Sequence, residues 1–155
     1  MAEKSPFSQI NQVGIVVENL DKAVKYYESL GIGPFKSVQP STLLRELYGK
    51  PVPPGDVLIK IATAQVGEMQ YELIQPIAEG TPWMEYLKEK GEGINHLGFQ
   101  VDDIDKEEAG LVKKGFKVVY KSRGKNPDGS VRCAAYVDTD KVGGFISEIR
   151  SRLPK

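Results

Sequence analysis

The chain has 155 residues, 21 Lys+Arg against 21 Asp+Glu, a formal net charge of zero, one histidine and one cysteine. One histidine excludes an HExxH zinc site, and one cysteine excludes an internal disulfide or a multi-cysteine cluster. Because there is no surplus of positive charge, neither nucleic acid nor an anionic membrane is expected as a partner.

Taken in chain order, the N-terminus lacks the apolar core of a signal peptide, and no segment approaches the roughly 20 apolar residues that span a bilayer. We therefore expect a cytoplasmic protein without a membrane contact. The first half predicts a buried strand at 10–17, an amphipathic helix at 20–30, a short strand at 34–39, a long loop at 40–56 with one helical turn around Leu43–Tyr48, and two alternating strands at 57–64 and 68–75.

The second half of the sequence predicts a helix that begins at Thr81 and Pro82 and ends at Gly91. It continues with a strand at 94–101, a helix at 103–114, strands at 116–123, 131–138 and 144–150, and a frayed tail at 151–155.

The two halves repeat each other. Adding 84 to a position in the first half finds its partner in the second, as for Gln12 and His96 or Gly14 and Gly98. We therefore predict an α+β fold in which two tandem βαβββ modules form a curled mixed sheet around a central cleft. The modules would span 1–78 and 94–155, with a linker helix at 79–93.

Four polar side chains interrupt apolar strands at related places in the two halves: Gln12, Glu72, His96 and Glu148. Alternation along a strand places Gln12 and His96 on the faces opposite the apolar side chains. A buried carboxylate is costly without a partner, so each glutamate requires solvent, a hydrogen-bonding partner or a metal. If all four face one concavity, one imidazole with three oxygen donors suits Mn²⁺, Fe²⁺, Co²⁺, Ni²⁺ or Zn²⁺. Taken singly, each residue is better explained as a solvated or structural polar group.

Four stretches carry a family resemblance: INQVGIVVENLDKAVKYYESLGIGPF, GEMQYELIQP, GEGINHLGFQVDDID and DTDKVGGFISEI. With them the chain resembles the vicinal oxygen chelate superfamily (glyoxalase I, bleomycin-resistance proteins and extradiol dioxygenases), and within it the methylmalonyl-CoA epimerase branch. The resemblance implies a homodimer, a small-molecule substrate and a divalent ion such as Co²⁺, Mn²⁺, Ni²⁺, Zn²⁺, Fe²⁺ or Mg²⁺. Carried over residue by residue, it implies His96, Glu148 and Glu72 as metal ligands, with Gln12 in the place of the usual first-strand histidine.

The chain departs from this pattern in three ways. Members of the epimerase branch often have two successive histidines where this chain has Asn95 and His96. An amide oxygen at Gln12 is a weaker ligand than imidazole, so either the metal affinity is lower or the metal is lost. Members of the branch also carry an acid/base glutamate in a PEHGV-like segment, where this chain has Pro54. Either Asp56 or Glu72 then takes that role, or the substrate is not methylmalonyl-CoA.

The resemblance implies an isomerase, an epimerase or racemase that removes a proton from the carbon α to a carbonyl and returns it on the other face. We expect Glu72 and Glu148 as the acid/base pair and His96 or Gln12 as donors to the enolate. The substrate would be an acyl-CoA such as methylmalonyl-CoA, or an aromatic ketone such as an isoflavanone. Basic residues that could address the phosphates of CoA are scattered along the sequence, as at Arg45, Lys50 and Lys60, which slightly disfavours an acyl-CoA substrate.

Three alternatives stay open. A non-catalytic binder of the bleomycin-resistance kind would use an aromatic cleft. Candidates to line it are Tyr71, Trp83, Tyr86 and Tyr136, although core packing is the expected role of most of them. A glyoxalase I-like lyase tolerates Gln or Glu in place of one histidine. Iron-dependent oxygen chemistry requires two histidines and ranks last. We expect Cys133 to be a small buried core residue.

Overall fold

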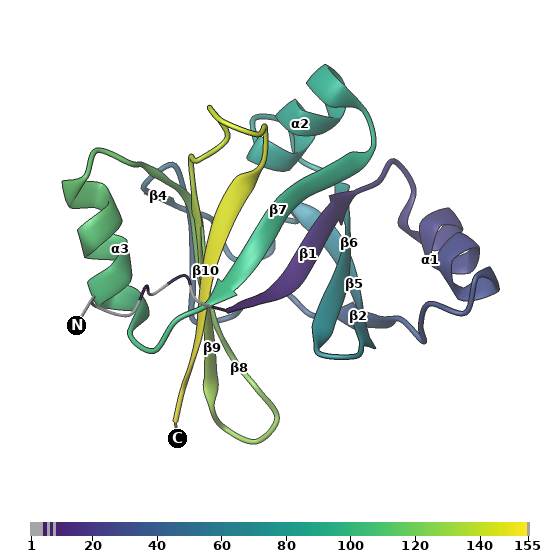
Figure 1. Ribbon diagram of the computed structural model, residues 1–155, viewed down its shortest axis with the longest axis horizontal. Helices are drawn as coiled ribbons and strands as arrows, with labels where there is room; N and C mark the ends of the chain where they lie inside the picture. Colours follow the sequence, from purple (N-terminus) through teal and green to yellow (C-terminus); the bar gives the residue numbers. More distant parts are fainter. Residues whose placement is uncertain (1–4, 6, 8, 155) are drawn as a thin grey trace. The chain divides into compact units, whose positions relative to one another are not determined.

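The computed structural model describes residues 5, 7 and 9–154 (Figure 1). This part of the chain contains three helices, α1 (Leu20–Ser29), α2 (Pro82–Lys90) and α3 (Ile104–Lys113). Its strands are β1 (Ile10–Val16), β2 (Lys36–Val38), β3 (Leu44–Leu47), β4 (Lys50–Pro51), β5 (Ile59–Val66), β6 (Met69–Pro76), β7 (Gly93–Gln100), β8 (Val118–Lys125), β9 (Val131–Val137) and β10 (Ile146–Leu153). None of these helices has the length and apolar character needed to cross a membrane.

The structure consists of two compact units. Unit 2 comprises residues 11–39 and 55–97, and unit 1 comprises the described residues of 1–10, 40–54 and 98–155. β7 contributes to both, because its residues 93–97 belong to unit 2 and its residues 98–100 to unit 1.

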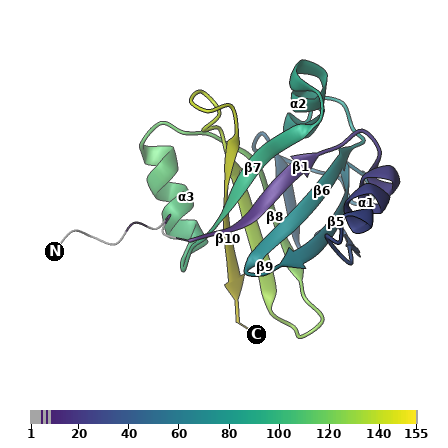
Figure 2. The ribbon, with the colours of Figure 1, turned by 45° about the vertical axis from the view of Figure 1, so that its right-hand side comes forward.

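Unit 2 has the strand order β2-β5-β6-β1-β7, in which β1 and β6 are parallel and the β5–β6 hairpin is antiparallel. α1 lies beside β5 and β6 (Figure 2). Asn19 caps this helix, because its side chain accepts a hydrogen bond from the backbone N–H of Lys22. The core below the helix is apolar and is built from Ile15, Val17, Leu20, Ala62 and Leu73. The predicted apolar face of the first strand is therefore confirmed.

Unit 1 has the strand order β7-β10-β9-β8-β3-β4, and the pairs β10–β9, β9–β8, β8–β3 and β3–β4 are antiparallel. α3 packs on β9 and β10, and Asp103 caps it by accepting from the backbone N–H of Lys106. The core between helix and strands contains Val101, Ile104, Leu111, Cys133, Ala135, Val137 and Ile149. Cys133 is a buried core residue, as expected.

The α+β class and the mixed pairing of strands are confirmed, and two local predictions are wrong. The segment expected to form a helical turn around 43–48 is strand β3, because its backbone pairs with Tyr120 to Arg123 of β8. The predicted frayed tail is also largely ordered, since Ser151 to Leu153 extend β10 along β9. In both places a distant strand supplies the hydrogen bonds, which local sequence does not reveal. The module boundaries at 78 and 94 stay a prediction.

Candidate active site

Three of the predicted site residues lie together in unit 2. Gln12 of β1, Glu72 of β6 and His96 of β7 have 2%, 4% and 0% of their surface exposed. Parallel pairing of β1 with β6 sets this arrangement, because it places Gln12 opposite Gln70 and Gly14 opposite Glu72. Buried polar side chains of this kind must form hydrogen bonds with one another or bind a ligand.

Gln12 bridges the other two. Its Oε1 lies 2.9 Å from Nε2 of His96, and its Nε2 donates to Oε2 of Glu72 and, over 2.7 Å, to Oε1 of Gln70. The Nε2 atom of His96 also lies 3.8 Å from Oε2 of Glu72. The amide therefore holds the imidazole and the carboxylate in one hydrogen-bonded group.

The second ring nitrogen of His96 faces an amide as well, since Nδ1 lies 3.3 Å from Oδ1 of Asn95. A hydrogen on Nδ1 would be donated to Asn95 and would leave the Nε2 lone pair for a metal ion. A hydrogen on Nε2 would instead be donated to Gln12. Asn95 thus provides the outer contact that metal-binding histidines commonly make.

Gly14 makes room for the imidazole. A Cβ atom at this position would lie 1.9 Å from Cε1, 2.3 Å from Nδ1 and 2.4 Å from Nε2 of His96. Such distances are far inside van der Waals contact, so only glycine leaves space for the ring. The glycine of the first strand is therefore a requirement of the site.

These donor atoms fit a divalent metal ion. With metal–ligand bonds of about 2.1 Å, neighbouring ligand atoms of an octahedral ion are about 3 Å apart and opposite ones about 4.2 Å. The Nε2–Oε1 distance of 2.9 Å between His96 and Gln12 lies at the first value, and the 3.8 Å between His96 and Glu72 lies between the two. An imidazole with oxygen donors is also the ligand chemistry that first-row divalent ions accept.

Glu148 lies in unit 1, on β10 opposite Tyr136 of β9, and 3% of its surface is exposed. Its Oε1 is 3.5 Å from Nε of Arg150, two residues along the same strand. The Arg150 guanidinium therefore lies beside this buried carboxylate, and the catalytic and metal-binding roles of Glu148 stay predictions.

The other candidates are placed differently. Asp56 lies in the loop before β5 and is exposed, outside the buried group of Gln12, Glu72 and His96. Trp83 is fully buried, and Tyr71 packs against Tyr27 with ring centroids 5.7 Å apart. Tyr136 packs in the same way against Tyr120, also at 5.7 Å. These contacts give the aromatic residues packing roles within their units.

Gln70 is a site residue that the sequence did not single out, and Asn95 was noted only as a departure from the family pattern. Alternation could have found Gln70, because it stands two residues before Glu72 on one strand and so shares its face. Nothing in the local pattern marks Asn95 as a partner of its neighbour His96.

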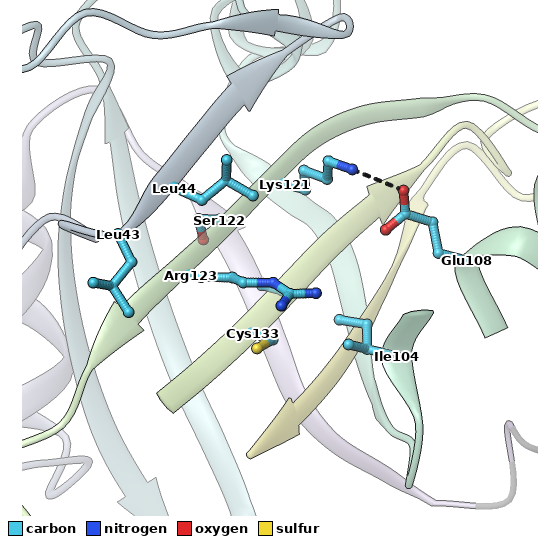
Figure 3. Close-up of a pocket in the computed structure, with 9 residues that line it drawn as sticks. Leu43, Leu44, Ile104, Glu108, Lys121, Ser122, Arg123 and Cys133 are labelled. Atoms are coloured by element: carbon cyan, nitrogen blue, oxygen red, sulfur yellow. Dashed lines mark hydrogen bonds and ion pairs between the residues drawn. The ribbon is translucent and has the colours of Figure 1, made fainter. Parts of the chain in front are cut away.

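Unit 1 also contains a cavity of about 300 Å³ between α3, β3 and β8 (Figure 3). The two basic side chains that line it form ion pairs: Lys121 contacts Glu108 over 3.1 Å, and Arg123 contacts Asp105 over 2.5 Å. Cys133 contributes to its wall. This cavity lies on the α3 side of the strands, whereas Glu148 projects from the other side, because Ile149 is the β10 residue in the core beneath α3.

A family model for the glyoxalase/bleomycin resistance protein/dioxygenase superfamily matches residues 11–134, more than half of the chain. The chain belongs to this superfamily. The resemblance to this superfamily that the sequence indicated is thereby confirmed.

Among individual relatives, the bovine protein named methylmalonyl-CoA epimerase, mitochondrial, is 24% identical over 112 residues, which cover 72% of this chain and 57% of the bovine protein. A crystal structure of methylmalonyl-CoA epimerase from Mycobacterium tuberculosis has a TM-score of 0.66 at 25% identity, covering 99% of this chain and 94% of that one. A methylmalonyl-CoA epimerase in complex with methylmalonyl-CoA and NH4+ has a TM-score of 0.68 at 20% identity, covering 94% of each chain. The last likeness shows the fold alone.

Proposed function

We propose that this protein is an isomerase that interconverts stereoisomers by moving a proton at the carbon α to the carbonyl of an acyl thioester. The observation that carries the proposal is the buried group of Gln12, Glu72 and His96, a carboxylate and an imidazole joined by an amide. Support for the substrate class comes from the epimerase name of the bovine relative and from the acyl-CoA complex of a structural neighbour.

Two acid/base groups are needed on opposite sides of the reacting carbon, and Glu72 and Glu148 are the residues proposed for them. Both are buried carboxylates in mid-strand, Glu72 on β6 and Glu148 on β10. The Gln12 amide orients Glu72 by donating to Oε2, while Arg150 orients Glu148. One carboxylate would take the proton while the other, protonated, would return it from the opposite face.

His96 would stabilise the enolate oxygen, either by donating a hydrogen bond from Nε2 or as ligand of a divalent ion. With Glu72, Gln12 and Glu148 it supplies the proposed metal ligands, and the acidic and imidazole members are all buried. A bound ion would act as a Lewis acid toward the thioester carbonyl. Without the ion, Gln12 and His96, which both contact Glu72, would take the same role by hydrogen bonding.

The test is hydrogen exchange at the α-carbon of methylmalonyl-CoA in D₂O, followed by mass spectrometry, with an isoflavanone as a second substrate. We expect exchange with the acyl-CoA, and a loss of roughly 100-fold or more in Glu72→Gln and Glu148→Gln. Glu79→Gln is the matched control, since this glutamate is exposed and contacts Lys88 only at the surface. Absence of exchange with the wild-type protein, or full exchange in both glutamine variants, would refute the proposal.

Asp56→Asn belongs in the same experiment, because Asp56 is the alternative acid/base group. Its exposed position predicts retention of exchange. A large loss in Asp56→Asn together with full exchange in Glu72→Gln would assign the proton transfer to Asp56 instead.

A further inference from the structure

The cavity of unit 1 reaches the single cysteine of the chain. Leu43, Leu44 and Ile104 supply apolar parts of its lining, and Cys133 contributes to its wall. Figure 3 shows the sulfur of Cys133 beside the side chain of Arg123. Because Cys133 is only 4% exposed, this cavity of about 300 Å³ is the route that the folded protein offers to the thiol. A water molecule takes about 30 Å³ of the liquid, so a molecule of a few heavy atoms has room there.

The strand register places a hydrogen-bond donor on each side of this thiol. Cys133 of β9 stands opposite Arg123 of β8 and opposite Ser151 of β10. Residues directly opposite each other share a face, and their Cβ atoms are about 4.5–5.5 Å apart. The face is the one that α3 covers, because Cys133 and Ile149 both belong to its core and Ser151 follows Ile149 by two residues. We call Arg123, Cys133 and Ser151 the thiol row.

The hydroxyl of Ser151 is the observation that points to a ligand atom in this row. Ser151 is 6% exposed, and its Oγ is buried and has no hydrogen-bond partner within residues 5, 7 and 9–154. Ile149 and Leu153, its neighbours on the same face of β10, are apolar core residues. A buried hydroxyl without a partner is unfavourable, and an acceptor atom beside it removes that cost. An oxygen bonded to the sulfur of Cys133 would supply such an acceptor from the neighbouring strand.

Arg123 supplies the second donor. Its side chain is 34% exposed, and its Nη2 donates to Oδ1 of Asp105 in the first turn of α3. This ion pair holds the guanidinium over the cavity that it lines. Because a guanidinium carries five N–H donors in a planar fork, one contact through Nη2 leaves donors that can turn toward an oxygen in the cavity.

A hydroperoxide is the reagent class that places an oxygen on this sulfur. The sulfur attacks one peroxide oxygen, the S–O bond forms as the O–O bond breaks, and the second oxygen leaves as water after taking the thiol proton. The sulfur is thereby oxidised by two electrons to a sulfenic acid, and the peroxide is reduced. Arg123 lies on the cavity side, where the leaving oxygen departs. Strand side chains commonly adopt two χ1 rotamers, so the S–OH group can turn from the cavity toward Ser151.

We infer that Cys133 is a modification site for hydroperoxides, oxidised through the cavity beside α3 to a sulfenic acid that Arg123 and Ser151 stabilise by hydrogen bonds. The chain has no second cysteine, so this sulfenic acid does not condense to an intramolecular disulfide. The inference is independent of the proposed function, because no member of the thiol row belongs to the buried group of Gln12, Glu72 and His96.

The test is oxidation of the folded protein by hydrogen peroxide. Catalase removes the peroxide, the protein is unfolded after increasing delays in guanidinium chloride that contains dimedone, and mass spectrometry counts the sulfenic acid adducts. We expect one adduct, on Cys133, and none in Cys133→Ala. Ser151→Ala should shorten the lifetime of the sulfenic acid roughly fivefold. Arg123→Gln should slow its formation by about the same factor.

Two further variants sharpen the experiment. Ser147→Ala is the matched control, since Ser147 is a buried serine of β10 that stands opposite Val137 and lies 2.9 Å from the hydroxyl of Thr139. It should leave both the rate and the lifetime unchanged. Leu43→Trp enlarges a partly exposed residue of the cavity lining and should slow oxidation of the folded protein roughly tenfold. All variants that retain Cys133 should be oxidised at one rate when unfolded.

Three results would overturn the inference. The first is a folded wild-type protein that resists peroxide concentrations sufficient to oxidise the unfolded chain. The second is a wild-type rate and lifetime in both Arg123→Gln and Ser151→Ala, and the third is an unchanged rate in Leu43→Trp. Melting temperatures identify variants that fail to fold. Ser151→Ala stays informative because its hydroxyl has no partner in the described part of the reduced protein.

Discussion

Replacing Gly14 by alanine tests the packing on which the whole site depends. The added methyl group would lie 1.9 Å from Cε1 of His96, whereas carbon atoms in contact are about 3.5 Å or more apart. The ring must therefore move by more than 1 Å, and it is fully buried. Moving it breaks the 2.9 Å contact with Gln12 and the 3.3 Å contact with Asn95.

Three terms decide the size of the effect. Overpacking of a filled site costs about 1–3 kcal/mol. Each hydrogen bond lost while its partner stays buried costs a further 1–3 kcal/mol or so. Against this, removing a glycine from a strand lowers the entropy of the unfolded chain and contributes only about 0.5–1 kcal/mol of stability. The clash therefore dominates, and we expect a loss of about 3–5 kcal/mol in the free energy of unfolding.

Thermal and urea denaturation measure this loss, which corresponds to a melting temperature lower by on the order of 10 °C for a chain of this size. Gly110→Ala is the matched control. Gly110 lies in α3, and a Cβ there would meet no atom within 4 Å. The same substitution should thus stabilise the protein by up to about 1 kcal/mol. A Gly14→Ala protein that melts within about 2 °C of the wild type would refute the packing of His96 on Gly14.

Three further predictions concern a ligand, a helix cap and a titrating loop. Gln12→His should raise the affinity for Co²⁺ or Zn²⁺ at least tenfold in a metal titration, because imidazole is a better ligand than an amide; equal affinity would mean that Gln12 is not a ligand. Thr81→Ala should cost about 1–2 kcal/mol in urea denaturation, since the buried Thr81 hydroxyl accepts from the N–H of Met84 and donates to the carbonyl of Ala78; no change would refute the cap. Hydrogen bonds from Ser130, and then Arg152, lower the pKa of the Asp128 carboxyl below its usual 3.8. The stabilisation is present above that value and is lost as the pH falls through the lower pKa of the folded state. Asp128→Asn should therefore reduce the fall in melting temperature at the acid end of a series from pH 5 to pH 2, and an unchanged profile would contradict the role of this loop.

The local sequence pattern was sufficient to predict elements whose backbone hydrogen bonds lie within the element itself. The helix predicted at 20–30 begins at Leu20, and Gly91 follows the last residue of α2, as predicted. Pattern failed at 43–48 and at 151–153, where the strand exists only because β8 or β9 offers unpaired backbone groups. Strand formation depends on a partner far away in sequence, whereas a helix satisfies its own hydrogen bonds.

The same distinction applies to the site. The 84-residue repeat by itself paired Gln12 with His96, and the position of Glu72 and Glu148 within otherwise apolar strands singled out these two glutamates. Only the tertiary structure decided that the Gln12 amide lies between His96 and Glu72, and that Gly14 leaves the space for the ring. It also decided that Arg45 of β3 and Arg150 of β10, more than a hundred residues apart, lie in register across β8 and β9. The alternation of side chains between two faces is a property of a single strand. The register is set by hydrogen bonds between strands, which the order of residues in the sequence does not specify.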